Sequence, residues 1–301
     1  MSKKPVSLKE YLHERKKLVD DALDLFLPGE DRFPSLIFRS MRYSVFAGGK
    51  RLRPILCMAA AEAVGGDIQS VLPVACAIEL IHTYSLIHDD LPSMDDDDFR
   101  RGVSTNHKVF GEGIAILAGD ALLTEAFHLM SCGVIRDRVS PEALLATISE
   151  VSVASGFDGM IGGQVVDLDS EGKDAGMETL HYIHSHKTEA LLTVSIRAGA
   201  LLSGASETDL DALSAYGKGI GLAFQITDDI LDIEGDSETL GKVTGSDNAH
   251  KKVTFPALLG LDASKRKGRE SINEALSNIA HFDDRADPLR MIANFIIERK
   301  S

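Results

Sequence analysis

Nearly every segment of this 301-residue chain has the length and the apolar spacing of a helix, and this feature constrains the fold most. No run of residues alternates apolar and polar side chains over the length of a β-strand. Ser7 and Glu10 have the spacing of a capping box that opens the first helix. The sequence therefore predicts an all-α protein with a single domain over residues 1–301. The expected helices cover roughly residues 8–27, 34–47, 54–64, 69–88, 113–131, 141–155, 179–202, 206–234, 265–280 and 288–299.

The composition argues against several classes of protein. A formal net charge of −14 gives no electrostatic support for binding a nucleic acid. We find no apolar run near the roughly 18 residues that a bilayer span requires, so no membrane span is expected. Residues Met1–Pro5 lack the apolar core of a signal peptide, and a cytoplasmic location is expected.

Two groups of aspartates interrupt the apolar helices, and the first comprises Asp89, Asp90 and Asp95–Asp98. Pro92 is a poor residue with which to continue a helix. Asp89 and Asp95 are also about 240° apart around an ideal helix, so they cannot share one helical face. We expect Asp89 and Asp90 to end the helix, and a turn to return Asp95 to the same place.

The second group comprises Asp228, Asp229 and Asp232. Asp228 and Asp232 have the spacing of residues that project from one face of a helix. Carboxylates this close repel one another, and a hard divalent cation such as Mg²⁺ removes the repulsion. A solvated acidic loop is the alternative for the first group alone. The second group favours a metal site at both places.

Cations accompany these carboxylates. Arg100 and Arg101 follow the first group, and segment Gly48–Pro54 places three cations after a glycine pair. Guanidinium and ammonium groups bind phosphate oxygens, so metal ions and cations are suited to share a diphosphate. The spacing is not that of a GxxxxGK[ST] phosphate loop, and a basic helix start on the surface is the alternative for Gly48–Pro54.

Other polar features are less specific. His82, alone on an apolar helix, is typical of a core histidine. Residues 235–254 lack a helical pattern, and loops of this length in compact domains are usually functional. The pair Arg299–Lys300 is expected to be a frayed basic end, with a role in closing the site as the alternative.

Taken together, these motifs resemble those of trans-isoprenyl diphosphate synthases, and most of all the bacterial farnesyl diphosphate synthases. The resemblance implies an isoprenoid synthase-like helical bundle around a central apolar cavity. The motifs span most of the chain and are jointly very specific. They are GGKRLRP at 48–54, IELIHTYSLIHDDLPSMDDDDFRRG at 78–102, LAGDALL at 117–123, KT at 187–188, FQITDDILD at 224–232, GKVTGSD at 241–247 and KKVTFPALLG at 251–260.

The resemblance implies a Mg²⁺-dependent head-to-tail condensation of isopentenyl diphosphate with dimethylallyl and geranyl diphosphates. The allylic C–O bond ionises, the isopentenyl double bond attacks, and the departing diphosphate takes up the proton. Farnesyl diphosphate (C15) is the expected product, with C10 and C20 products as alternatives. About three Mg²⁺ ions per active site are implied, with Mn²⁺ as a substitute. The resemblance also implies a homodimer. A class I terpene cyclase and a non-catalytic partner subunit stay open as other classes.

The resemblance assigns roles residue by residue. The implied metal ligands are Asp89, Asp90, Asp95, Asp228, Asp229 and Asp232. The implied isopentenyl diphosphate contacts are Lys50, Arg53, His82 and Arg101. The implied allylic diphosphate contacts are Arg100, Lys187, Lys242 and Lys252, with Thr188 and Gln225 near the developing cation. Tyr84, with Ser85 beside it, is expected to set product length, because a ring across the pocket floor stops elongation by overpacking. The expected catalytic residues are Asp89, Asp90, Asp95, Arg100, Lys187, Thr188, Gln225 and Asp228.

Overall fold

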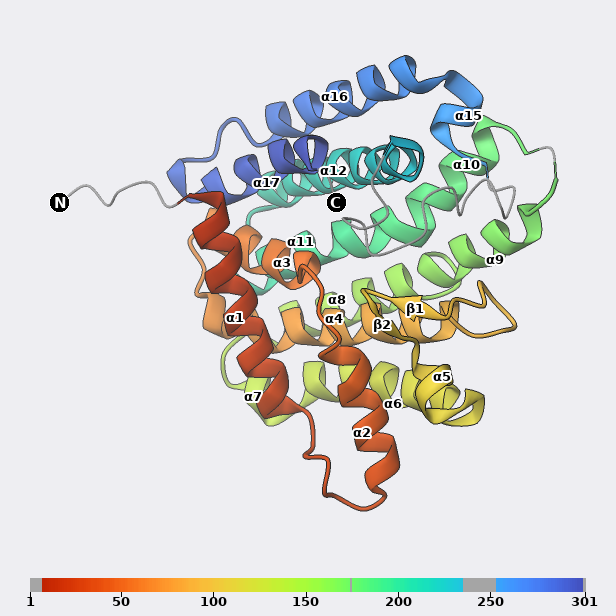
Figure 1. Ribbon diagram of the computed structural model, residues 1–301. Helices are drawn as coiled ribbons and strands as arrows, with labels where there is room; N and C mark the ends of the chain where they lie inside the picture. The colour runs from red at the N-terminus through yellow and green to blue at the C-terminus, as the bar shows by residue number, and fades with distance from the viewer. Residues whose placement is uncertain (1–6, 174, 235–252, 300–301) are drawn as a thin grey trace.

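The computed structural model describes residues 7–173, 175–234 and 253–299, and all of its long elements are helices (Figure 1). The predicted all-α fold is confirmed. The helices of the first half are α1 Leu8–Phe26, α2 Ser35–Val45, α3 Leu52–Ala63, α4 Ile68–Asp89, α5 Asn106–Phe110, α6 Glu112–Ser131 and α7 Gly133–Arg136. Those of the second half are α8 Pro141–Ser155, α9 Met160–Ser170, α10 Met177–Ile183, α11 Ala190–Leu202, α12 Glu207–Glu234, α15 Phe255–Leu259, α16 Leu261–Asn278 and α17 Asp287–Glu298, with a 3₁₀ turn at Asp284–Ala286.

Local sequence explains several helix starts. The Ser7 hydroxyl accepts the Glu10 N–H at 3.3 Å, and the Glu10 carboxylate accepts the Ser7 N–H at 3.1 Å. This completes the predicted capping box of α1. The Ser140 hydroxyl caps α8 by accepting the Ala143 N–H at 3.1 Å, and Pro141 fills the first helical position, where a missing N–H costs nothing.

The structure departs from the predicted helices where α9 packs on the segment between α10 and α11. The predicted helix over 179–202 is interrupted by a π-helical turn, His184–Glu189, between α10 and α11. Beside that turn, α9 forms partly from the glycine-rich stretch at 156–163. Gly163 lies so close to the turn that a Cβ on it would be 2.3 Å from the Lys187 backbone nitrogen. The glycine therefore permits close packing of α9 on the π-helical turn.

The only strands in the described ranges form a short hairpin after the first aspartate group. β1 (Phe99–Arg100) pairs antiparallel with β2 (Val103–Ser104), with Phe99 opposite Ser104. This hairpin could not be predicted from the sequence, because two-residue strands carry no periodic signal.

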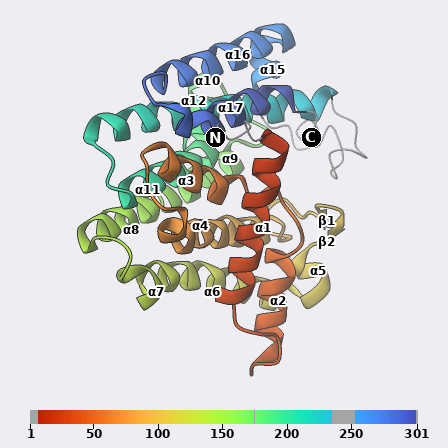
Figure 2. The same ribbon diagram turned by 90° about the vertical axis from the view of Figure 1, so that its left-hand side faces the viewer.

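The helices stack in successive layers (Figure 1). From one end of the molecule the order is α16, then α12, then α11 with α3, then α4 with α8, and finally α6. Helix α1 crosses the edge of this stack and packs on α3, α4 and α17 (Figure 2). Close approach between layers relies on small residues. A Cβ on Gly199 of α11 would lie 1.9 Å from the Cys57 carbonyl oxygen of α3.

Three segments are long and apolar enough to cross a membrane by length and composition, which corrects the expectation of no such run. They are Ile68–Asp89, Glu112–Ser131 and Pro141–Ser170. Within the protein, 78% of the apolar stretch in the first segment is buried, so the apolar side chains of α4 form part of the core. Only 39% of each of the other two stretches is buried, and α6, α8 and α9 therefore carry an apolar outer surface.

Candidate active site

The first acidic motif, Asp89, Asp90 and Asp95, lies where α4 ends. Asp89 is the last helical residue and Asp90 is the C-cap. The Asp95 N–H donates to the Asp89 carbonyl at 2.9 Å, and Asp96 has a left-handed φ of 50°. Both predictions about this segment, the helix end and the returning turn, are confirmed.

The two sides of this acidic loop differ in their surroundings. Asp90 is buried, and the Arg100 Nε donates to its carboxylate at 2.5 Å. Arg100 also lies 3.4 Å from Asp97. Asp98 is instead exposed and pairs with Lys108 at 2.6 Å. Arg100 is thus held on the acidic motif itself, and Asp98 belongs to the solvated outer side.

Arg101 joins the hairpin to the segment Gly48–Pro54. Its Nη1 donates to the Gly48 carbonyl at 2.6 Å. A Cβ on Gly49 would come within 2.6 Å of the same Arg101 nitrogen, and Gly49 has a φ of 116°. Only glycine permits both the left-handed backbone and this close approach. The loop and the hairpin, far apart in sequence, therefore meet at one place.

Lys50, Arg53 and Arg101, here called the cation cluster, form the basic side of the site, and His82 lies beside them. Burial, with a smaller contribution from the charge of Arg101, lowers the pKa of Arg53 to about 10, although the charge of Glu79 opposes the shift. Burial and the charges of Arg53 and Arg101 hold the pKa of His82 well below its ordinary value, so this imidazole is neutral at pH 7. The Arg53 Nε is buried and has no acceptor within the described ranges. Crowded cations with an unsatisfied donor favour an anion such as a diphosphate.

The second acidic motif, Asp228, Asp229 and Asp232, lies in the last turns of α12. The Arg299 Nη2 donates to Asp228 at 2.6 Å and to the Phe224 carbonyl at 3.0 Å. The Arg299 guanidinium also stacks over the Phe224 ring at 3.9 Å. With a side chain only 5% exposed, Arg299 is fixed in place, and the expectation of a frayed end was wrong for this residue.

Asp229 points in a different direction from Asp228. Its carboxylate is buried and accepts the Phe255 N–H at 2.8 Å, at the start of α15. The His184 Nε2 lies 3.6 Å from the same carboxylate oxygen, and the His184 ring stacks on Phe255. Asp229 thus anchors the start of α15 on α12, and the π-helical turn packs against α15 through the His184 ring. Asp232 is half-buried one turn further along.

The π-helical turn carries Lys187 and Thr188 and faces α9 and α12. The Lys187 ammonium pairs with Asp167 of α9 at 2.6 Å. The Gln225 side-chain amide nitrogen lies 3.1 Å from the His184 Nδ1. Short π-helical turns occur often at functional sites. Sequence reasoning missed Asp167 and His184, since only the unusual helical turn brings them to these partners.

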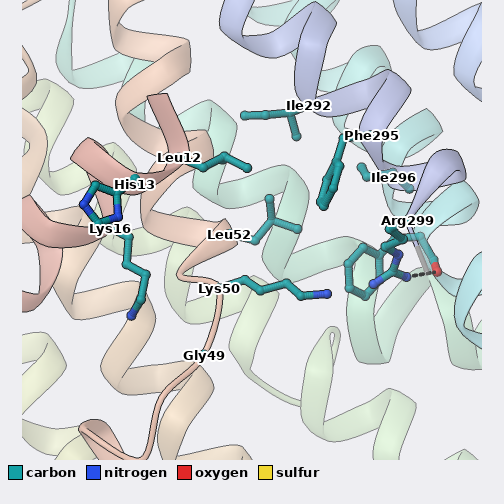
Figure 3. A pocket seen from close by; sticks show the side chains of 11 residues that line it. Leu12, His13, Lys16, Gly49, Lys50, Leu52, Ile292, Phe295, Ile296 and Arg299 are labelled. Carbon is teal, nitrogen blue, oxygen red and sulfur yellow. Dashed lines mark hydrogen bonds between the residues drawn. The ribbon is translucent and has the colours of Figure 1, made fainter. Parts of the chain in front are cut away.

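An apolar cavity of about 340 Å³ adjoins the site between α1, α17 and the Gly48–Pro54 loop (Figure 3). Lys50 extends across it towards Arg299, and Leu52 and Ile292 form part of its wall. Partial burial and the charge of Arg299 lower the pKa of Lys50, while Asp228 opposes the shift. Lys50 and Asp228 therefore lie close enough for their charges to interact. The cation cluster and the second acidic motif thus belong to the same site.

Tyr84 and Ser85 lie on α4, just before the first acidic motif. Tyr84 is 6% exposed, and its ring meets His88 edge-on at 5.7 Å. Burial, and secondarily the charge of Asp89, raise the pKa of Tyr84 to about 12. The hydroxyl is buried and has no hydrogen-bond partner in the part of the chain that is described. Ser85 is half-buried and donates to the His82 carbonyl at 2.9 Å.

The carboxylates are chemically suited to Mg²⁺, although no three His, Cys, Asp or Glu side chains within the described ranges converge to form a ready-made metal site. Mg²⁺ is typically held by one or two carboxylates and takes its other ligands from water and substrate phosphates. The donor set therefore fits a metal ion that arrives with a diphosphate. Two residues expected to contact the allylic diphosphate, Lys242 and Lys252, lie outside the described residues.

Comparison with known proteins gives one consistent answer. A family model described as polyprenyl synthetase matches residues 34–291. A geranylgeranyl diphosphate synthase from Cyanophora paradoxa is 47% identical, over 98% of this chain and 97% of the relative. A farnesyl diphosphate synthase from Geobacillus stearothermophilus is 46% identical, over 98% of each chain.

A solved structure agrees with these relatives in fold. The geranylgeranyl pyrophosphate synthetase from Pyrococcus horikoshii superposes with a TM-score of 0.88 at 31% identity, covering 97% of this chain and 98% of that one. The predicted isoprenoid synthase fold is thereby confirmed. The chain belongs to the polyprenyl synthetase family and is a trans-prenyl diphosphate synthase, a class of prenyltransferase that acts on isopentenyl and allylic diphosphates.

Proposed function

We propose that this chain is a farnesyl diphosphate synthase that condenses isopentenyl diphosphate with dimethylallyl and then geranyl diphosphate. The observation that carries the proposal is the meeting of three segments distant in sequence. Arg101 bonds to Gly48, Arg100 bonds to Asp90, and Lys50 lies near Asp228 and Arg299. Carboxylates suited to metal ions thus stand beside cations suited to phosphate oxygens.

Mg²⁺ is the proposed cofactor, about three ions per active site with Mn²⁺ as a substitute. Asp89, Asp95, Asp228 and Asp232 are the proposed direct ligands. Asp90 and Asp229 are proposed to orient the two motifs through Arg100 and Phe255, because both are buried whereas the proposed direct ligands are half-buried. When bound, the metal ions neutralise the diphosphate that leaves the allylic carbon.

The protein groups have separate tasks in this proposal. The cation cluster binds the diphosphate of isopentenyl diphosphate, with His82 neutral. Arg100 and Lys187, together with Lys242 and Lys252, hold the allylic diphosphate, and Thr188 and Gln225 lie by the developing cation. Apolar helices around the site exclude water that would capture the carbocation. No protein base is assigned, and the departing diphosphate takes up the proton.

The product length is the finer part of the proposal. Relatives of nearly equal identity are named for C15 and for C20 products. We favour C15 because the buried Tyr84 ring, with Ser85 beside it, lies directly before the first acidic motif. A large side chain there limits the space for a growing prenyl tail. A C20 or a C10 synthase is the alternative.

A homodimer of single-domain chains in the cytoplasm completes the proposal. An apolar outer surface on α6, α8, α9 and the turn between α8 and α9 supports the dimer, because patches of exposed apolar side chains are typical of protein interfaces. A non-catalytic partner subunit is the alternative of another class, and an intact set of aspartates argues against it. The exposed apolar residues of this surface are Ile116, Leu117, Leu145, Val153, Phe157, Ile161 and Val165.

The decisive experiment is mass spectrometry of the product formed by the pure protein with Mg²⁺, isopentenyl diphosphate and dimethylallyl diphosphate. A dominant C15 diphosphate is expected. A C20 product would retain the chemistry and overturn the assignment of Tyr84. No condensation, with geranyl or farnesyl diphosphate as starter either, would favour the partner-subunit alternative. Omitting Mg²⁺ and adding a chelator is expected to abolish the reaction, and restoring Mg²⁺ is expected to recover it.

A further inference from the structure

Arg51 lies between Lys50 and Arg53 in sequence, but its side chain is directed into the protein interior. The side chain is 1% exposed, and all three of its nitrogens are bonded. Nε donates to Asp20 of α1 at 2.8 Å, and Nη1 donates to Glu79 of α4 at 2.9 Å. Nη2 donates to the last carbonyl of α2 at 2.6 Å. One guanidinium therefore ties three helices to the start of α3.

The backbone at Arg51 depends on these contacts. Arg51 is the N-cap of α3 and has a left-handed conformation, with φ 52° and ψ 36°. A residue with a Cβ adopts this conformation reluctantly and keeps it only when its surroundings impose it. The buried bonds of the guanidinium supply that constraint. They also fix where the neighbouring Lys50 and Arg53 can project.

Glu79 is the more buried of the two carboxylate partners. Its side chain is 2% exposed, whereas that of Asp20 is 31% exposed. Glu79 lies one turn before His82 on α4 and close to the cation cluster. Burial lowers the pKa of Arg101, and the charge of Glu79 opposes that shift. A buried carboxylate here offsets the repulsion among cations that must lie together before any diphosphate arrives.

We propose that Glu79 is a positioning residue for isopentenyl diphosphate. It holds Arg51, and through Arg51 it holds the loop that carries Lys50 and Arg53 in the conformation that binds the diphosphate. This inference rests on the proposed function, since it takes the cation cluster as the isopentenyl diphosphate site. Glu79 acts through Arg51 and is not itself a substrate contact.

The test is the variant Glu79→Gln, which keeps the size of the side chain and one acceptor oxygen but removes the charge. The KM for isopentenyl diphosphate is expected to rise about tenfold, and the KM for geranyl diphosphate to stay within about twofold. Calorimetric titration of isopentenyl diphosphate into the metal-free protein is expected to show the same tenfold loss of affinity. Binding measured this way is independent of turnover.

Glu62→Gln is the matched control. Glu62 also joins α1 to α3, because it accepts bonds from Arg15 at 2.5 Å and from Tyr11 at 2.6 Å. It lies at the opposite end of α3 from the Gly48–Pro54 loop. This variant is expected to lower thermal stability but to leave both KM values within about twofold. If Glu79→Gln does not fold, Asp20→Asn decides, with an expected rise of about threefold in the isopentenyl diphosphate KM alone.

Three results would overturn the inference. They are a folded Glu79→Gln protein with unchanged affinity for isopentenyl diphosphate, equal rises in both KM values, or the same selective rise in Glu62→Gln. For Asp20→Asn, if it has to decide, an unchanged isopentenyl diphosphate KM overturns the inference. A wild-type protein that neither binds nor condenses isopentenyl diphosphate would instead overturn the proposed function, so the two failures are distinguishable.

Discussion

The two acidic motifs present similar residues on different backbones. The second motif is part of one continuous helix, α12, and its spacing alone places Asp228 and Asp232 on one face. The first motif begins at the end of α4 and needs a turn to return Asp95 to Asp89. A motif within a helix needs little support, whereas a motif on a loop depends on the contacts that hold the loop.

Those contacts differ as well. The loop of the first motif is fixed by Arg100 on Asp90 and by Arg101 on Gly48, so it is coupled to the cation cluster. The second motif gives one carboxylate, Asp229, to the packing of α15. Each motif thus combines a buried aspartate that organises its surroundings with half-buried aspartates that are proposed to bind metal ions. Four predictions test this division.

The largest effect is expected for the proposed direct ligands. Asp95→Asn and Asp228→Asn should each lower kcat about 10³-fold, because metal-assisted ionisation loses a charged ligand. Steady-state kinetics at saturating substrates measures this. Asp98→Asn, in the same loop but paired with Lys108 on the surface, should change kcat less than about threefold. Equal losses in all three variants would contradict the assignment.

The free energy of unfolding is expected to depend mainly on the buried aspartates, Asp90 and Asp229. Asp90→Ala leaves Arg100 poorly paired and should cost about 3 kcal/mol of unfolding free energy. Asp229→Ala leaves the buried Phe255 N–H without its acceptor and should cost about 2 kcal/mol. Asp98→Ala removes a side chain that is 64% exposed and pairs with the exposed Lys108, and it should cost less than about 1 kcal/mol. Urea denaturation of the metal-free proteins distinguishes this order from a uniform loss.

Among these variants, only a substitution of Tyr84 on α4 is expected to change the product, and it should do so without a large loss of rate. Tyr84→Ala removes a buried ring before the first motif and should lengthen the main product by at least one isoprene unit. Tyr84→Phe is the control and should retain the wild-type product, since the hydroxyl has no partner within the described ranges. Mass spectrometry of the reaction products measures the chain length that each variant makes. An unchanged length in Tyr84→Ala would remove Tyr84 as the floor.

The smallest effect is a pH dependence beside α12. Burial raises the pKa of Glu189 from 4.5 to about 7, and a Cβ on Gly221 of α12 would lie 2.9 Å from the Glu189 Cβ. Because the folded pKa is the higher one, folding favours the protonated acid. The stability this gives is present below about pH 4.5 and is lost as the pH rises through about 7. Glu189→Gln should therefore be more stable than the wild type by about 1–2 kcal/mol at pH 8. Thermal melts at pH 5 should show little of this gain, and an equal gain at both pH values would exclude the titration.

Sequence alone determined the features that depend on near neighbours. Apolar spacing gave the all-α class, and Ser7 with Glu10 gave the start of α1. Pro92 and the Asp89–Asp95 spacing gave the turn after α4, because helical geometry cannot place those two carboxylates together. The family followed from motif residues that need no coordinates.

Tertiary structure decided what depends on partners far apart in the chain. Asp229 looks like its neighbours Asp228 and Asp232 in sequence, but packing against α15 buries it at the Phe255 N–H. Arg299 looks like part of a frayed end in sequence, yet its position at the C-terminal end of α17 brings it to Asp228. Arg51 sits among substrate-binding cations in sequence, and only the packing of α1 and α4 directs it inward. The spacing of apolar residues in the sequence indicates which face of a helix is apolar. The partner of a polar side chain is decided only when the helices pack.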